Sequence, residues 1–259
     1  MKTKQPIGIF DSGVGGLSVW KAIAKLLPNE NYIYVADSKN APYGTKSKDR
    51  IIALSIKNTQ FLIDQGCKMV VVACNTATTN AIGELRELFE IPFVGIEPAI
   101  KPAAIRSKTI GVLATKGTLT SDLFQDRHSK YDSKVTIVEQ VGSGLVEMIE
   151  NGKINTPEMT LALSTLLKPM LDKKIEALVL GCTHYNFLQD VLTKILPNHI
   201  EIWDARDAIA NRTAYILDDY KMRSTNQSQG NTRILTNSNT TAIQNFVGDT
   251  MKIEILLNI

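Results

Sequence analysis

Short apolar runs alternate with stretches of helical period along most of the chain. The apolar runs predict buried strands of a parallel sheet, and the amphipathic stretches predict connecting helices. The predicted strands are 7–10, 32–36, 70–73, 92–96, one beginning at 109, 135–138, 178–180, 200–203, 233–236 and 252–257. The predicted helices are 17–23, 47–65, 77–89, 144–149, 157–171, one beginning near 185, 205–220 and 241–247. This alternation predicts right-handed βαβ units and an α/β fold with mainly parallel sheets.

The same pattern of elements occurs twice along the chain. Residues 7–16 and 109–118 each combine a strand, a polar turn containing glycine and the start of a helix. Each is followed by a strand that ends in cysteine, 66 residues from Gly8 to Cys74 and 71 residues from Gly111 to Cys182. We interpret this as an internal repeat of two α/β halves with matching sites.

Cys74 and Cys182 each end a predicted strand and precede polar residues that open a helix. In open α/β sheets ligands bind at this end of the strands, and a helix N-terminus favours a thiolate. A single cysteine in this position is more often a small buried hydrophobe, which is our interpretation of Cys67. Two cysteines at equivalent points of a repeat instead predict a pair of functional thiols.

Several polar residues accompany the cysteines without defining one chemistry. The turn at residues 11–16 matches no phosphate-binding motif, contains no lysine, and carries Asp11, which would repel a phosphate. It is either a tight strand-to-helix turn or a site where Asp11 accepts from an ammonium and Ser12 meets a carboxylate. His184 could carry a proton, orient Cys182 or simply open a helix, and Tyr43-Gly44 by itself is typical of a turn.

Composition narrows the class of protein. The chain has 259 residues, of which 44% are hydrophobic and 21% are charged, as in an ordinary globular protein. The formal charge of +3 is small, so we do not expect a nucleic-acid partner. No apolar stretch is long enough to span a membrane, and no signal-peptide core is evident. The low and odd number of cysteines, three, argues against a disulfide scaffold. We therefore expect a cytoplasmic location, where thiols stay reduced. Good zinc ligands cannot be assembled, because Cys182 with His184 gives one pair only.

Two thiols on opposite sides of a ligand suit one chemistry in particular. One thiolate removes a proton from a carbon, and the opposite thiol returns a proton to the other face, which inverts the centre. The developing negative charge needs preorganised donors, for which Ser12, Asn75, Thr76 and Thr183 are suitable residue types. No pyridoxal lysine signature or flavin fingerprint is evident, so we expect a cofactor-independent reaction.

Four ordered motifs across nearly the whole chain resemble the cofactor-independent aspartate/glutamate racemase family, and within it the glutamate racemases. They are residues 10–17 (FDSGVGGL), 42–44 (PYG), 73–77 (ACNTA) and 180–185 (LGCTHY). The resemblance implies an isomerase that interconverts L- and D-glutamate and supplies D-glutamate for peptidoglycan, and hence for cell wall biogenesis and cell shape.

The resemblance also implies roles for individual residues. Cys74 would act on the D-enantiomer and Cys182 on the L-enantiomer. Residues that would hold or polarise glutamate are Asp11, Ser12, Tyr43, Gly44, Asn75, Thr76, Thr183 and His184, with Thr118 and Glu147 as further family positions of second rank. No metal is implied. Enzymes of this kind are often dimers, so a homodimer is expected, although the sequence shows no interface signature.

The family architecture would put residues 1–97 and 208–259 in one α/β domain and residues 98–207 in a similar second domain. The two would be related by pseudo-twofold symmetry, with the active site in the cleft between them. The chain departs from the family pattern around 138–141, where a Cys-Pro pair is expected, and at Ala205, where serine is more usual. The alternatives are an aspartate racemase, another racemase or decarboxylase of the same fold, or an idle amino-acid-binding or partner-binding module.

Overall fold

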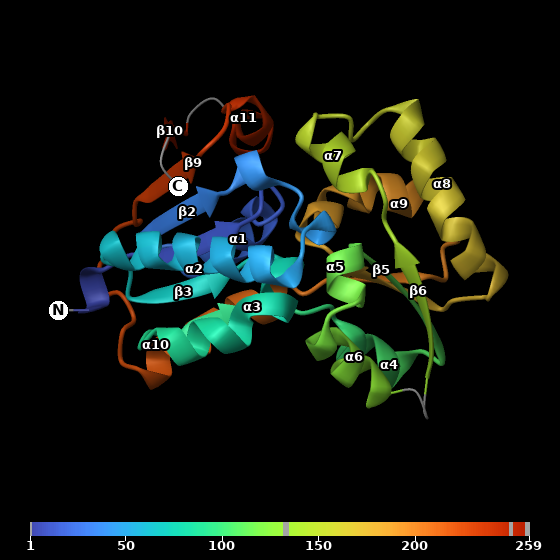
Figure 1. Cartoon of the computed structure of the whole chain (residues 1–259), viewed down its shortest axis with the longest axis horizontal. Coiled ribbons are helices and arrows are strands. Elements are labelled where there is room, and N and C mark those ends of the chain that lie inside the picture. Colours follow the sequence, from blue (N-terminus) through green and yellow to red (C-terminus); the bar gives the residue numbers. More distant parts are fainter. Residues whose placement is uncertain (1, 132–134, 249–250, 257–259) are drawn as a thin grey trace.

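The computed structural model describes residues 2–131, 135–248 and 251–256. Within these residues, strands and helices alternate and the strands form two separate sheets, each flanked by helices (Figure 1). Every pair of neighbouring strands is parallel. The predicted α/β fold with two parallel sheets is confirmed.

The larger sheet has the strand order β10-β9-β2-β1-β3-β4. Its strands are β1 (Ile7–Asp11), β2 (Tyr32–Ala36), β3 (Met69–Val72), β4 (Phe93–Gly95), β9 (Thr232–Thr236) and β10 (Ile253–Ile255). The three central strands β1, β2 and β3 are buried along their whole length, which is why they occur in the sequence as continuous apolar runs. The expected last strand, 252–257, extends at its final residue outside the described part of the chain.

The smaller sheet has the strand order β6-β5-β7-β8. Its strands are β5 (Thr109–Ala114), β6 (Thr136–Val141), β7 (Ala177–Gly181) and β8 (Glu201–Trp203). This order repeats β2-β1-β3-β4 of the larger sheet, element for element. The internal repeat predicted from the spacing of the cysteines therefore corresponds to two sheets of the same connectivity.

The helices connect successive strands. They are α1 (Leu17–Leu26), α2 (Lys48–Asp64), α3 (Asn75–Leu88), α4 (Ile100–Arg106), α5 (Lys116–Leu119), α6 (Asp122–Ser129), α7 (Leu145–Glu150), α8 (Pro157–Asp172), α9 (Gln189–Ile195), α10 (Arg206–Asp219) and α11 (Thr241–Val247). Short 3₁₀ helices occur at Lys2–Lys4, Ser38–Asn40, Tyr43–Thr45 and Thr183–Leu188.

Several helical segments differ from expectation. The helix expected from residue 77 begins at Asn75, because Cys74 is its N-cap. After Cys182 the chain forms a 3₁₀ helix before α9, where one helix from about residue 185 was expected. Helix α4 was not predicted; it carries Pro102 in its first turn, where a missing N–H is tolerated.

The chain returns to the larger sheet after the smaller one is complete. Helix α10 packs against α1, and β9 pairs with β2, so that the last elements lie beside the first ones (Figure 1). One continuous apolar cluster includes Ile9 of β1 and Leu17 of α1 from the first half, and Leu145 of α7 and Tyr185 after β7 from the second. The two halves therefore share one apolar core. No helix in the described parts of the chain is long and apolar enough to cross a membrane.

Candidate active site

The strand register brings the predicted site residues to one edge of each sheet. Phe10 pairs with Val72, so Asp11 and Cys74 leave neighbouring strands at the same end. In the smaller sheet Ala114 pairs with Gly181, which puts Thr115 and Cys182 at the equivalent position. These are the carboxyl ends of parallel strands, where α/β proteins bind ligands.

Cys74 is buried at the N-terminus of α3. The backbone N–H of Ala77 donates to its Sγ at 3.4 Å, and Sγ lies 3.7 Å from Oγ of Ser12. Burial raises the pKa of Cys74 to about 12, and the charges of Asp11 and Cys182 add to that rise. The contacts with Ala77 and Ser12 lower it, but less. The expected preference of the helix N-terminus for a thiolate is therefore outweighed by burial, which favours the neutral thiol.

Cys182 lies beside a histidine and a carboxylate. Its Sγ is 3.8 Å from Nδ1 of His184, whose Nε2 lies 2.7 Å from Oε1 of Glu150. Burial alone would lower the pKa of His184, but its hydrogen bonds to Cys182 and Glu150 and their charges raise that pKa well above its ordinary value. A sulfur, an imidazole and a carboxylate in this order can pass a proton to and from the thiol.

Glu150 was not identified from the sequence, whereas Glu147 was. Both lie on α7, but Glu147 is exposed and lines a cavity of about 240 Å³ with Gly44 and Lys116. Glu150 instead reaches His184 and also accepts a hydrogen bond from the N–H of Val14 at 2.9 Å. The helical pattern of α7 could have pointed to Glu150 instead of Glu147. Glu150 lies at the border of the apolar face that contains the buried Ile149, whereas Glu147 lies opposite that face.

Asp11 and Thr183 join the two cysteine corners. Oδ2 of Asp11 accepts from Oγ1 of Thr183 at 3.0 Å, and Oδ1 accepts from the N–H of Gly13 at 2.7 Å. Burial raises the pKa of Asp11 to about 6, although the charge of His184 and these hydrogen bonds lower it. The carboxylate beside Cys74 is thus bonded to the residue that follows Cys182.

The glycines of the 11–16 turn allow this turn to approach the opposite half closely. A Cβ on Gly13 would lie 1.9 Å from Oε1 of Glu150, and a Cβ on Gly15 would lie 2.4 Å from Nδ1 of His184. Any side chain at these positions would displace the histidine and its carboxylate. Close packing against Glu150 and His184 therefore explains these glycines without a phosphate-binding role.

Three threonine hydroxyls form a cluster between the two sheets. Oγ1 of Thr76 lies 2.8 Å from that of Thr115 and 3.2 Å from that of Thr118, and the last two are 3.1 Å apart. Gly44 packs onto this cluster, since a Cβ there would lie 2.6 Å from Cβ of Thr115. Of the two second-rank positions, Thr118 therefore belongs to this cluster. Thr115 belongs with it and was not identified from the sequence.

The remaining predicted residues have more local contacts. Asn75 donates from Nδ2 to the carbonyl of Ile96 at 3.5 Å. The hydroxyl of Tyr43 donates to Oδ2 of Asp37 at 2.5 Å and accepts from Asn58, so it is directed into the protein. Cys67 is buried at the opposite end of β3 from Cys74, away from the other predicted residues.

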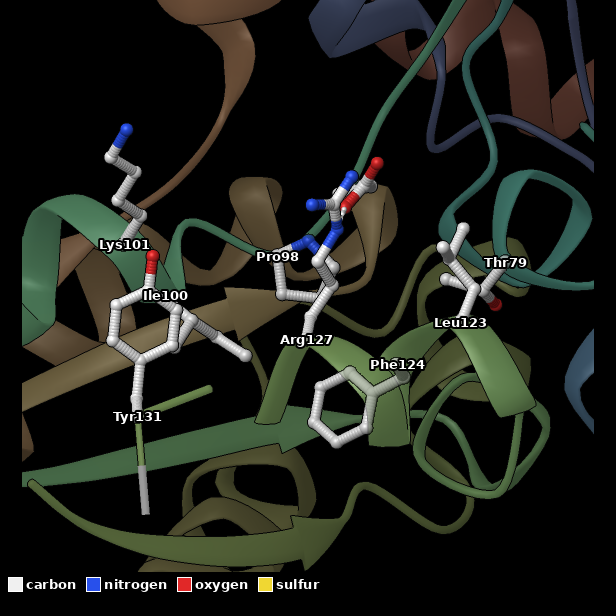
Figure 2. A pocket seen from close by; sticks show the side chains of 9 residues that line it. Thr79, Pro98, Ile100, Lys101, Leu123, Phe124, Arg127 and Tyr131 are labelled. Atoms are coloured by element: carbon white, nitrogen blue, oxygen red, sulfur yellow. Dashed lines mark hydrogen bonds and ion pairs between the residues drawn. The ribbon is translucent and has the colours of Figure 1, made fainter. Parts of the chain in front are cut away.

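A second cavity, of about 170 Å³, lies outside this constellation. It is lined from α3, α4, α6 and the segment after β4 by Thr79, Glu97, Pro98, Ile100, Lys101, Leu123, Phe124, Arg127 and Tyr131. Figure 2 shows the rings of Phe124 and Tyr131 at its wall. Nε of Arg127 donates to Oε2 of Glu97 at 3.1 Å. None of the predicted site residues lines it. Across the described residues, no three His, Cys, Asp or Glu side chains gather as a metal site.

Comparison with known proteins agrees with the fold. The chain matches the family described as Asp/Glu/Hydantoin racemase over residues 7–213. A glutamate racemase of Herpetosiphon aurantiacus is 42% identical over 234 residues, which are 90% of this chain and 92% of that protein.

Solved structures give the same result. A glutamate racemase from Francisella tularensis in complex with D-glutamate has a TM-score of 0.85 at 29% identity, covering 98% of each chain. Escherichia coli glutamate racemase in complex with L-glutamate and the activator UDP-MurNAc-ala has a TM-score of 0.84 at 32% identity, covering 97% of this chain and 98% of that one. Fold and relatives together define an amino-acid racemase, which is an isomerase. The chain belongs to the Asp/Glu/Hydantoin racemase family.

Proposed function

We propose that this racemase interconverts L- and D-glutamate without a cofactor, by two-base proton transfer between Cys74 and Cys182. The observation that carries the proposal is the pair of cysteines at equivalent strand ends of two repeated sheets, each with different proton-transfer partners. The relatives at about 42% identity are glutamate racemases, which supports glutamate over aspartate as the substrate.

In the direction from L- to D-glutamate, the thiolate of Cys182 takes the α-proton. The Cα–H bond breaks, an S–H bond forms, and the electron pair moves into the α-carboxylate as an enolate-like intermediate. The neutral thiol of Cys74 then gives its proton to the opposite face of Cα, which leaves Cys74 as the thiolate. Exchange of protons with solvent restores the starting state. The raised pKa of Cys74 supports this assignment, because a thiol held neutral is an acid ready to donate.

In the reverse direction Cys74 must become a thiolate, and the substrate itself makes that easier. The carboxylate of Asp11 is the first charge that raises the pKa of Cys74 after burial. An ammonium group of bound glutamate beside Asp11 would neutralise that charge and bring a positive charge to the thiol. Asp11 thereby has two roles in this account, which are to hold the ammonium and to couple substrate binding to the protonation of Cys74.

Donors at the strand ends would stabilise the developing negative charge. Helix α3 begins immediately after Cys74, and the N–H groups of a helix N-terminus suit an anion. The hydroxyl of Ser12 and the side chain of Asn75 lie at the same end of the larger sheet, and Thr183 follows Cys182. We propose that these donors bind the α-carboxylate of glutamate. His184 and Glu150 would instead act on the protonation of Cys182.

The distal carboxylate of glutamate would lie against the threonine cluster. Thr76, Thr115 and Thr118 offer hydroxyls within 3.2 Å of one another, and Gly44 packs directly against Thr115. Hydroxyl groups can turn to donate to an oxyanion without a charge of their own.

We further propose the domain division and the cellular role that the resemblance implies. The first domain is 1–97 with 208–259 and the second is 98–207, a division supported by the strand composition of the two sheets. D-glutamate would serve peptidoglycan synthesis and so cell wall and cell shape. A cytoplasmic location is supported by three free cysteines. A homodimer, and the lack of a nucleic-acid or membrane partner, stay predictions.

The test is racemisation of L-glutamate by purified protein with no cofactor added, beside L-aspartate, and in the variants Cys74→Ser and Cys182→Ser. We expect turnover of glutamate to exceed that of aspartate and each variant to lose racemisation. Elimination of a leaving group from Cβ of a substituted glutamate needs one base only, so Cys182→Ser should retain it for the D-form and Cys74→Ser for the L-form. Faster turnover of aspartate than of glutamate would show that aspartate is the substrate. Full racemisation by Cys74→Ser would refute the two-base mechanism. No turnover of either amino acid by the wild type would favour the idle binding module.

A further inference from the structure

The segment that carries Tyr43 and Gly44 is held from the far end of the chain. Ala36 at the end of β2 pairs with Thr236 at the end of β9, so the next residues, Asp37 and Asn237, leave neighbouring strands side by side. Nδ2 of Asn237 donates to Oδ1 of Asp37, and Oδ1 of Asn237 accepts from the N–H of Lys39 at 2.9 Å. One amide side chain thus fixes both the carboxyl group and the backbone that follows it.

Asp37 passes this constraint on to Tyr43. It is buried, and besides Asn237 it accepts hydrogen bonds from Nδ2 of Asn40 at 2.8 Å and from the hydroxyl of Tyr43. The Tyr43 hydroxyl also accepts from Asn58 of α2 at 3.0 Å. A buried carboxyl group is costly unless it is saturated with donors, so losing one donor favours rearrangement of the others.

The position of the next residue, Gly44, matters at the site. Gly44 touches Thr115 so closely that even a Cβ would not fit, and its carbonyl lies against Gly117. A displacement of Tyr43 by a few tenths of an ångström would therefore change the contact between Gly44 and the threonine cluster. We propose that Asn237 is a positioning residue that sets the Tyr43–Gly44 segment for substrate binding, acting through Asp37. This inference rests on the proposed glutamate site, because it takes the threonine cluster as the place of the distal carboxylate.

The C-terminal segment that carries Asn237 lies beyond the part of the chain matched by the family. The family match ends at residue 213, well before Asn237. Strand β9 is also secured without Asn237, by parallel pairing with β2 on one side and β10 on the other. A substitution at residue 237 should therefore leave the strand in position while releasing the contacts to Asp37 and Lys39.

The experiment compares Asn237→Ala with Asn239→Ala in steady-state racemisation of glutamate. Asn239 is exposed on the same segment and accepts from the N–H of Thr241, so its variant controls for loosening of that segment. We expect Asn237→Ala to raise KM for both enantiomers about tenfold, as for loss of one hydrogen bond to a charged group, with kcat changed less. Asn239→Ala should leave KM unchanged.

A second arm separates positioning from stability. In a Tyr43→Phe background the hydrogen bond from Tyr43 to Asp37 is already removed, so Asn237→Ala should add little further increase in KM. If Asn237→Ala lowers the melting temperature with unchanged KM, or adds its full effect in the Tyr43→Phe background, the inference is overturned. Wild-type protein that does not racemise glutamate would instead refute the proposed function, so the two failures are distinguishable.

Discussion

Oγ1 of Thr183 donates to Oδ2 of Asp11 at 3.0 Å, so a residue adjacent to Cys182 is bonded to the carboxylate beside Cys74. This single contact crosses between the two sheets and links the environments of both thiols. Its strength depends on Asp11 being ionised, because a carboxylate accepts hydrogen bonds better than a carboxylic acid. The contact between Asp11 and Thr183 should therefore depend on pH.

Replacement of Thr183 by valine removes the hydroxyl and keeps the shape of the side chain. The pKa of Asp11 should rise above its present value of about 6, because this hydrogen bond is one of the interactions that lower it. We expect kcat/KM at neutral pH to fall about ten- to a hundredfold, and its decline at acid pH to move to higher pH. Thr183→Ser retains the hydroxyl and should keep the wild-type profile. A Thr183→Val profile that falls uniformly at all pH values would contradict the link to Asp11.

Asp11 should destabilise the folded protein at neutral pH. Its pKa is raised by burial from 3.8 in the unfolded chain to about 6 in the fold, so the folded state binds more protons between these values. Its contribution to stability is complete below the unfolded pKa and is lost as pH rises through the folded pKa. A difference of this size corresponds to about 3 kcal/mol.

We therefore expect Asp11→Asn to increase the free energy of unfolding at pH 8 by up to about 3 kcal/mol and to change it little at pH 4. Denaturant titrations at the two pH values measure this, and racemisation should be strongly impaired at both. Equal effects of the substitution at pH 4 and pH 8 would show that burial does not hold the pKa of Asp11 up.

Glu150 and Glu147 offer a matched pair on one helix. Glu150→Gln removes the charge that helps raise the pKa of His184, whereas the exposed Glu147 is not in contact with that ring. Because L- and D-glutamate are equal in free energy, kcat/KM must fall by the same factor in both directions. We expect a loss of about ten- to a hundredfold for Glu150→Gln and less than about twofold for Glu147→Gln.

The direction of the defect appears in the isotope effect. If Glu150 acts through His184 on Cys182, proton removal from L-glutamate becomes more rate-limiting in Glu150→Gln. The primary deuterium isotope effect on kcat should then increase for α-deuterated L-glutamate more than for the D-form. A larger effect with Glu147→Gln than with Glu150→Gln would restore the sequence-based choice of Glu147.

Local patterns were enough to predict most of the strands. The central strands lie in the interior on both faces, so their sequences are apolar throughout and their ends are marked by Asp11, Cys74 and Cys182. The pairing of β9 with β2 could not be predicted from any local pattern, because it joins residues about 200 positions apart. For the same reason the contact between Asp37 and Asn237 had no signal in the sequence.

The sequence identified most residues of the candidate site but not their electrostatics. The sequence shows that Cys74 precedes a helix, but it does not show that Asp11 and full burial outweigh the helix N-terminus. Similarly, Thr115 has an ordinary N-cap pattern with Thr118, and only the approach of α3 shows that both hydroxyls meet Thr76. Chemistry that depends on desolvation or on packing between the halves requires the structure.

The most direct test of the two-base account is the position of deuterium in the first moments of reaction in D₂O. Purified protein is mixed with L-glutamate, and both enantiomers are separated and analysed at Cα well before equilibrium. The account predicts deuterium in newly formed D-glutamate and almost none in the remaining L-glutamate, because one cysteine removes the proton and the other supplies a solvent-derived one. Equal deuterium in both enantiomers from the start would show a single base serving both faces and would contradict the paired roles of Cys74 and Cys182.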